Sequence, residues 1–153
     1  MNERLSFEDY LEKNEKLIYS NVGTSMMPLL RQGKDLFVIT KRGSERFKAG
    51  DVVLYRRPPD SYVLHRIIKV RKNDYVIIGD NCIRKEYGIK DKDILGSMTG
   101  YVRNGREHSI SEKGYRAYSW VMLYLCGPRI FLKKCEVKMK GIIKKIWLKT
   151  TTR

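Results

Sequence analysis

The chain has 153 residues, of which 42% are hydrophobic and 32% charged, and its formal net charge is +15. This length suits one domain, or one domain with an appendage, and the composition excludes a disordered chain. So basic a chain points to an anionic partner, either a nucleic acid or an anionic membrane surface. More than half of the excess lies near the C-terminus, because residues 129–153 carry nine Lys/Arg and one Glu, a net of +8.

The cysteines indicate a reducing compartment. Cys82, Cys126 and Cys135 form neither a CxxC pair nor an even set, which argues against a disulfide framework and against a structural zinc site. The first sixteen residues, MNERLSFEDYLEKNEK, contain no apolar segment of the kind found in signal peptides or membrane spans. We therefore expect a cytoplasmic protein with no signal peptide and no transmembrane helix.

The middle of the chain is patterned for strands. A capping box at residues 6–9 predicts a short helix from about Phe7 to Glu15. Runs rich in Val, Ile and Tyr follow at 36–40, 52–55, 62–70, 75–78 and 94–102, mostly separated by Gly, Asn, Asp or Pro. The fold class expected is mainly β, an antiparallel core with a short N-terminal helix and C-terminal helices. We expect a helical lead at 1–20, a β-rich core at 21–110 and a basic helical appendage at 111–153.

The appendage expected at 111–153 begins with an apolar stretch and continues with an amphipathic one. The uncharged stretch 117–126 is far below the roughly 20 residues that a spanning helix needs, and Gly127-Pro128 should break it. Beyond this break, lysines segregate from an apolar helix face formed by Met139, Ile142, Ile143 and Ile146. Two interpretations stay open: a peripheral helix on an anionic membrane surface, or a helix that caps the β core. Nucleic acid is not an expected partner, because the tail has few interleaved aromatic residues.

A candidate nucleophile stands in the first third of the chain. Ser25 belongs to the segment Gly23-Thr24-Ser25-Met26-Met27-Pro28, between a predicted strand and Gly33-Lys34-Asp35. A permissive glycine before it and a proline that fixes φ after it can present a hydroxyl at a turn and leave backbone N–H groups free for an oxyanion. An ordinary surface turn is the alternative interpretation.

The candidate general base is His65. It lies in the strand-like run Val63-Leu64-His65-Arg66-Ile67, on the face opposite to Arg66. Such a histidine is more often a core residue than a base, but a serine hydroxyl needs a proton acceptor before it attacks. The other histidine, His108, lies in a Gly/Arg/Glu-rich segment that predicts a turn. His65 is therefore the base expected for Ser25.

A carboxylate could orient the imidazole as the third member of a triad. Gly79-Asp80-Asn81 follows a predicted strand and is a common turn sequence, and Glu86 comes five residues later. The residues themselves leave open whether Asp80 or Glu86 has this role.

Four segments together resemble the type I signal peptidases, in the clan that also contains self-cleaving repressors. Residues 23–30 are similar to the nucleophile segment with its SMxP signature, and 48–53, KAGDVV, to the next conserved box. Residues 64–67 fall where the base lies, and 79–81 are similar to the last box, in the same order and with similar spacing. His-Arg at 65–66 is the pattern of the endoplasmic-reticulum and archaeal type, in which an Asp is usual near the position of Glu86.

This resemblance implies a serine endopeptidase with a signal-peptidase-like β core. Ser25 would attack the scissile carbonyl, His65 would take its proton, and Glu86 or Asp80 would hold the imidazole. Backbone near Gly23 and Ser25 would bind the oxyanion, while Met26 and Met27 would line the substrate pocket or pack in the core. The expected substrate is an extended peptide or protein segment with small residues before the cut. No metal and no organic cofactor is expected.

Two other functions share parts of this pattern. A catalytically inactive, peptidase-like basic binding module would explain the charge of the tail. A self-processing repressor-type peptidase would belong to the same clan, but it needs a DNA-binding domain, for which about twenty N-terminal residues are too few. The self-cleaving repressors that this chain resembles use a lysine as the base, whereas the aligned residue here is His65.

Overall fold

The computed structural model describes residues 6–41, 43–59 and 61–151, and at 145, 146 and 148–151 it describes the backbone alone. The chain begins with helix α1 (Phe7–Asn14), which agrees with the predicted helix to within a residue. The hydroxyl of Ser6 accepts a hydrogen bond from the backbone N–H of Asp9 (3.1 Å), so the predicted N-cap is present. Leu11 of this helix is buried against the sheet.

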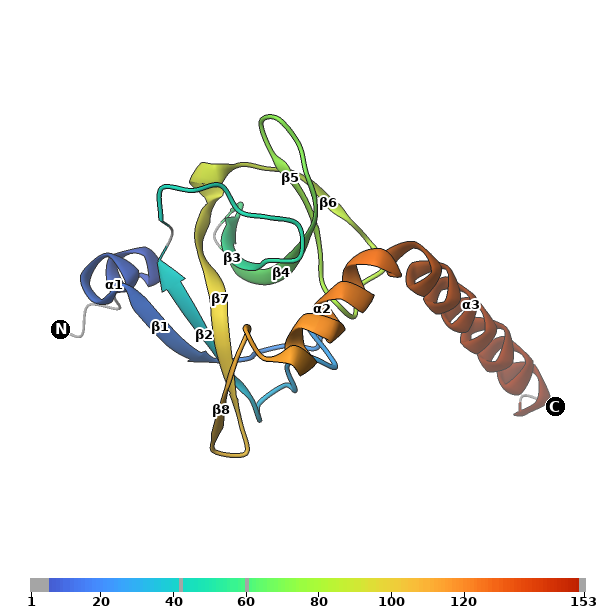
Figure 1. Cartoon of the computed structure of the whole chain (residues 1–153). Coiled ribbons are helices and arrows are strands. Elements are labelled where there is room, and N and C mark those ends of the chain that lie inside the picture. The colour runs from blue at the N-terminus through green and yellow to red at the C-terminus, as the bar shows by residue number, and fades with distance from the viewer. Residues whose placement is uncertain (1–5, 42, 60, 152–153) are drawn as a thin grey trace.

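Eight antiparallel strands form one sheet, which confirms the predicted mainly-β fold class. Their order in the sheet is β1-β2-β7-β3-β4-β5-β6, with β8 paired to β7. The strands are β1 (Lys16–Ser20), β2 (Leu36–Lys41), β3 (Val52–Arg57), β4 (Ser61–Val70), β5 (Tyr75–Ile78), β6 (Glu86–Ile89), β7 (Ile94–Arg103) and β8 (Arg106–Ser109), with a 3-10 turn, η1 (Asp91–Asp93), before β7. The sheet curls around an apolar interior, so strands far apart in the sequence face one another (Figure 1).

Three strands, β1, β6 and β8, were not among the predicted runs, and β1 lies within residues 1–20, where a helical lead was expected. β1 has a single buried residue, Leu17, and β6 and β8 are four residues long and largely solvent-facing, so these strands lack the pattern of a core strand. His108 consequently lies on β8 and not in a turn.

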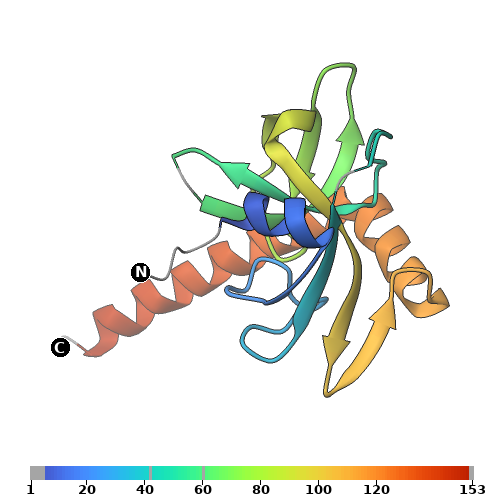
Figure 2. The same cartoon turned by 90° about the vertical axis from the view of Figure 1, so that its left-hand side faces the viewer.

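The helix break lies earlier than predicted. Helix α2 (Lys113–Tyr124) is followed by a single residue, Leu125, before helix α3 (Cys126–Thr151) begins. Gly127 and Pro128 therefore lie in the first turn of α3. A proline costs little there, because the N–H groups of the first turn have no partner within the helix. The helical appendage is thus two helices in different directions, as Figures 1 and 2 show.

A buried ion pair joins the sheet to α2. Arg66 on β4 is fully buried and donates to both carboxylate oxygens of Asp80, from Nε and Nη2, at 2.8 Å each. Burial opposes the charged guanidinium, but the hydrogen bonds and charge of Asp80 outweigh it and raise the pKa of Arg66. Tyr118 of α2 donates to the same carboxylate (3.0 Å), and the Arg66 Nη1 donates to the hydroxyl of Ser119 (2.7 Å). The turn at Asp80 therefore cannot move without α2 and β4.

The root of α3 packs on the same region. Cys126 and Ile130 are buried in a small cluster with Ile78, at the end of β5. Arg129 donates to the backbone carbonyl of Asp80, and Lys133 donates to the backbone and side-chain oxygens of Asn81. Beyond this root α3 projects away from the sheet (Figure 1). In the part of the chain that the structure describes, no helix is long and apolar enough to cross a membrane.

We predict that Asp80→Asn destabilises the fold strongly. Removing one partner of a buried pair leaves the guanidinium uncompensated, which costs roughly 3–5 kcal/mol of unfolding free energy. Asp74→Asn is the matched control, since it breaks the partly exposed Arg71–Asp74 pair and should cost less than about 1 kcal/mol. Urea denaturation of both variants measures the difference, and equal losses would show that the buried pair is not the anchor inferred above.

Candidate active site

One cavity brings together the residues that the sequence singled out. It has a volume of about 680 Å³, and Ser25, His65 and Glu86 all lie in its lining. Its other walls come from α1, β1, β2, β3, β4 and the segment before β6. The remaining lining residues are Phe7, Tyr19, Ser20, Asn21, Val22, Phe37, Leu54, Arg57, Tyr62, Val63, Leu64, Cys82, Arg84 and Lys85.

The loop that carries Ser25 is closed at its start by Asn21. This buried side chain donates from Nδ2 to the carbonyls of Gly23 (3.1 Å) and Leu30 (3.2 Å), while its own backbone carbonyl accepts from Gly33 (3.0 Å). Gly23 has φ of 102°, a conformation that a residue with a side chain rarely adopts. The glycine before the serine is thus required by the turn itself.

Asp35 closes the other end of the loop. The carboxylate is fully buried and accepts hydrogen bonds from Arg31 and Arg103. Burial would raise its pKa, but the hydrogen bonds of the two arginines more than compensate and hold the pKa of Asp35 well below its usual range. Arg103 also donates to the carbonyl of Leu29 (2.7 Å), which ties the loop to β7. Both ends of the serine loop are therefore fixed by buried polar groups.

Gly79 is the point at which the segments converge. A Cβ at this position would lie 2.7 Å from the backbone oxygen of Ser25, 2.9 Å from Nε2 of His65 and 2.7 Å from Sγ of Cys82. Next to it, the backbone N–H of Asn81 donates to the backbone carbonyl of Ser25 (2.7 Å), and its Nδ2 donates to the backbone carbonyl of Thr24 (3.0 Å). The Gly-Asp-Asn turn thus holds the serine loop against the histidine, and only glycine leaves enough space.

His65 is buried and its ring faces a carboxylate. Nδ1 lies 3.1 Å from Oε1 of Glu86, a close contact in which Nδ1 makes no hydrogen bond. Burial lowers the pKa of His65, and the charge of Glu86 offsets part of this effect. Near neutral pH the imidazole is therefore uncharged, which is the form a general base requires.

Glu86 has its own supports, which sequence reasoning missed. Its carboxylate accepts from the hydroxyl of Tyr55 (2.9 Å) and from Nε of Arg57 (3.1 Å), and Arg57 also forms an ion pair with Oε1. Both residues belong to β3, whose register pairs Val53 with His65. The alternation Val53, Tyr55, Arg57 beside His65 was the available signal, but it required knowing that β3 and β4 pair.

The two candidate acids lie in different places. Glu86 contacts the imidazole, whereas the side chain of Asp80 is engaged by Arg66 and Tyr118. Glu86 therefore lies beside His65, whereas Asp80 belongs to the buried network with Arg66 and Tyr118 behind the site.

Ser25 itself is partly exposed, and its hydroxyl and backbone N–H are not committed elsewhere. Within residues 6–41, 43–59 and 61–151, neither its hydroxyl nor its backbone N–H has a hydrogen-bond partner, so Ser25 and His65 are not bonded to each other. Catalytic hydrogen bonds are often long in the absence of substrate and tighten in the complex. Met26 is fully buried in the core and Met27 is exposed, and the cavity lining is made by other residues.

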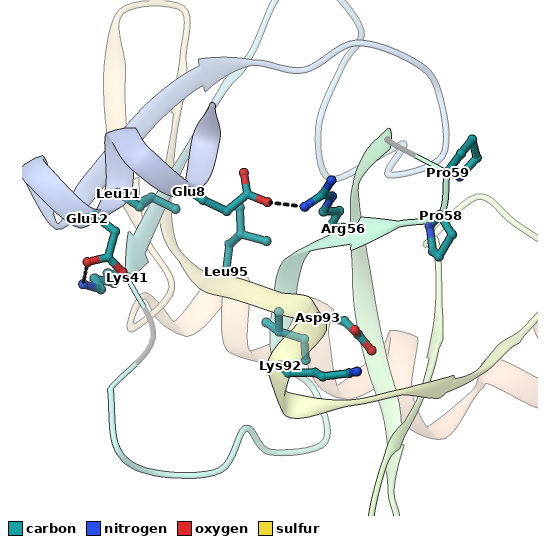
Figure 3. A pocket seen from close by; sticks show the side chains of 11 residues that line it. Glu8, Leu11, Glu12, Lys41, Arg56, Pro58, Pro59, Lys92, Asp93 and Leu95 are labelled. Atoms are coloured by element: carbon teal, nitrogen blue, oxygen red, sulfur yellow. Dashed lines mark ion pairs between the residues drawn. The ribbon is translucent and has the colours of Figure 1, made fainter. Parts of the chain in front are cut away.

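A second cavity of about 690 Å³ lies between α1, the end of β3 and the start of β7 (Figure 3). Its lining is charged, but the charges neutralise one another, as in the pairs Glu12–Lys41 (3.0 Å) and Glu8–Arg56 (3.9 Å). It contains no serine, cysteine or histidine. The slightly larger cavity is therefore not the candidate active site.

The chain is similar to catalytic subunits of the signal peptidase complex. It is 25% identical to the catalytic subunit SEC11C of Homo sapiens over 138 residues, which cover 81% of this chain and 71% of that protein. It is 33% identical to SEC11 of Zygosaccharomyces rouxii over 93 residues, 51% of this chain and 54% of that protein. No family model and no solved structure matches the chain. These distant identities support a type I signal peptidase-like relationship, and with it a peptidase-like hydrolase.

We predict that His65 titrates below its ordinary pKa of about 6.5 and that Glu86→Gln lowers the midpoint further. Burial disfavours the imidazolium, and the substitution removes the nearest charge that favours it. Ring-proton NMR as a function of pH measures the midpoint. Glu112→Gln is the matched control, because Glu112 lies 3.1 Å from the more exposed His108 and should not affect His65. A higher midpoint in Glu86→Gln would contradict the contact.

We predict that Gly79→Ala forces the serine loop and the histidine apart. The new methyl group overlaps backbone as well as side-chain atoms, and overpacking of this kind costs about 1–3 kcal/mol. Gly114→Ala, at the start of α2 with no atom within 4 Å of the new Cβ, should be neutral or slightly stabilising. Urea denaturation compares the two variants, and an unchanged Gly79→Ala protein would mean that the segments are not in close contact.

Proposed function

We propose that this chain is a serine endopeptidase of the signal-peptidase type, with residues 21–110 as its catalytic core. The observation that carries the proposal is the convergence of Ser25, His65 and Glu86 on one cavity, across the close approach at Gly79. A nucleophile, a buried neutral base and a carboxylate beside that base are the parts that acyl transfer needs. A cytoplasmic location belongs to this proposal and rests on the odd set of unpaired cysteines.

The proposed mechanism uses Ser25, His65 and Glu86 together. His65 accepts the proton of the Ser25 hydroxyl as the oxygen attacks the scissile carbonyl, and it returns the proton to the leaving amine. Glu86 stabilises the imidazolium that forms between these steps, and Tyr55 and Arg57 hold Glu86 in place. The uncommitted backbone N–H of Ser25, near Gly23, donates to the oxyanion. The tetrahedral intermediate then collapses to an acyl-enzyme, which water hydrolyses with His65 again as base.

Two of the open strand edges line the candidate cavity and are available to an extended peptide. Among the described strands, β1 pairs only with β2, and residues 61–65 of β4 pair with β3 but not with β5. Tyr19 and Ser20 of β1 and residues 62–65 of β4 line the same cavity. Unpaired backbone groups on such edges bind a peptide by adding a strand. The preference for small residues before the cut rests on the likeness to signal peptidases alone.

The decisive experiment is cleavage of a peptide library that varies the residues before each bond, with products identified by mass spectrometry. The wild-type protein should cut a subset of peptides, while Ser25→Ala and His65→Ala should each lose at least about 10³-fold in rate. The double variant should be little slower than either single one, because the two residues act as a unit. Rates should rise with pH through the His65 midpoint and be full at neutrality, whereas a rise only above about pH 9 would indicate a lysine base.

Two variants control for unrelated effects. Ser44→Ala removes an exposed serine outside the cavity, and His108→Ala removes the other histidine, so both should cleave like the wild type. A library that binds to the wild-type protein but stays intact would favour the inactive binding module. Cleavage confined to a bond of the chain itself would favour the self-processing peptidase.

A further inference from the structure

Helices α2 and α3 expose a connected apolar surface. On α2 the rings of Trp120 and Tyr124 lie one turn apart, with centroids 4.9 Å from each other. A groove of about 470 Å³ between the helices joins Val121 of α2 and the C-cap residue Leu125 to Leu132 of α3. We call these residues, together with the exposed apolar residues further along α3, the α2–α3 surface: Trp120, Val121, Tyr124, Leu125, Phe131, Leu132, Met139, Ile142, Ile143 and Trp147.

Positive charge flanks this surface. Helix α3 contains eight Lys/Arg and one Glu, and that single acid, Glu136, is paired with Lys140. At 3.6 residues per turn, Leu132, Met139 and Ile143 project from one side of the helix, and Lys138 and Lys144 lie about 120° from the centre of that side, one on each flank. Val137 is an exception, an apolar residue on the lysine side. The helix thus presents an apolar stripe between rows of exposed cations.

The β core does not cover the stripe. Among the side chains of α3 that the structure describes, those buried against the sheet are Cys126 and Ile130, at its root. Ile142 and Ile143 are 44% and 60% exposed, so the interpretation in which they cap the core does not hold for these two residues. The side chain of Ile146 lies outside the described residues. Over its 26 residues α3 is about 39 Å long, and most of that length extends beyond the sheet (Figure 1).

We propose that the α2–α3 surface binds an anionic membrane surface, with α3 lying in the interface. The apolar stripe enters the boundary between headgroups and acyl chains, and the flanking lysines meet anionic headgroups. Both tryptophans of the chain belong to this surface, and Trp and Tyr are enriched at membrane–water interfaces. This inference does not depend on the proposed peptidase activity.

Charge favours a lipid surface over a second copy of the chain. Two α3 helices packed along their stripes would bring rows of lysines together, with one Glu per helix to compensate. An anionic bilayer neutralises the same lysines and accepts the stripe at once.

A bound helix would also fix the position of the candidate active site. Lys133, at the root of α3, donates to Asn81, and Asn81 donates to the backbone oxygen of Ser25. The surface-bound helix and the serine loop are therefore connected through one residue. The cavity is then at a fixed distance from the membrane surface, within reach of a substrate segment that emerges from the membrane.

The test is co-sedimentation of the full chain, in the wild-type form, with vesicles of phosphatidylcholine containing phosphatidylserine, at low salt. Binding should fall at least about 10-fold with pure phosphatidylcholine, and tryptophan fluorescence should shift to the blue only with the anionic vesicles. The triple variant Met139→Ser, Ile142→Ser, Ile143→Ser should lose binding at least about 10-fold while keeping the melting temperature, because these side chains are exposed.

A matched pair of charge variants separates the helix from net charge alone. Replacing Lys134, Lys138 and Lys144 by Gln should reduce binding at least about 10-fold, while replacing Lys34, Lys72 and Lys92, which are exposed elsewhere, should reduce it much less. Equal loss in both would overturn the proposal, as would failure to sediment with anionic vesicles. A dimer that the triple serine variant dissociates would assign the surface to a second copy instead. Ser25→Ala should bind like the wild type, so the outcome is independent of catalysis.

Discussion

The candidate site depends on the ion pair between Arg66 and Asp80, whose side chains are both buried in the interior. Arg66 is adjacent to His65 in the chain, and Asp80 is adjacent to Gly79, so the pair fixes the two backbone segments that meet behind the cavity. The same carboxylate holds α2 through Tyr118, and its backbone oxygen holds the root of α3 through Arg129. Desolvating two charges is costly, so such a pair fixes geometry more than it adds stability.

Asp80 and Glu86 have different roles: Asp80 fixes the backbone behind the site, and Glu86 contacts the imidazole. Both carboxylate oxygens of Asp80 accept hydrogen bonds from Arg66, so neither is free to contact the imidazole of His65 as it gains and loses a proton. Glu86 approaches from β6, which lies at the edge of the sheet, and it is 24% exposed. Arg57 and Tyr55 keep it in place without burying it.

The mainly-β fold, strands β2, β3, β4, β5 and β7 and the order of the motif segments could be predicted, because core strands and turn residues leave local patterns in the sequence. Strands β1, β6 and β8 were not among the predicted runs, since strands at the edge of the sheet are largely solvent-exposed and lack the pattern of a core strand. The choice between Asp80 and Glu86 could not be predicted either, because it depends on which strands pair and on the partner that each carboxylate finds. Ser25 and His65 stood out by type and setting, whereas Tyr55 and Arg57 matter only through the contact of β3 with β4. The exposed face of α3 was visible as a pattern, but only the structure separates its packed root from its free length.

The open strand edges also govern how the molecule behaves among its own copies. Unpaired backbone groups on β1 and on the first half of β4 would accept a strand from a neighbouring molecule as readily as a peptide, which is the usual route to edge-to-edge aggregation. A net charge of +15 opposes this by mutual repulsion, and Arg84 and Lys85 place part of that charge beside the cavity. Salt reduces the range of the repulsion to about 8 Å at physiological ionic strength. The colloidal stability of the protein is thus electrostatic in origin, and the concentration at which it stays monodisperse falls as salt is added.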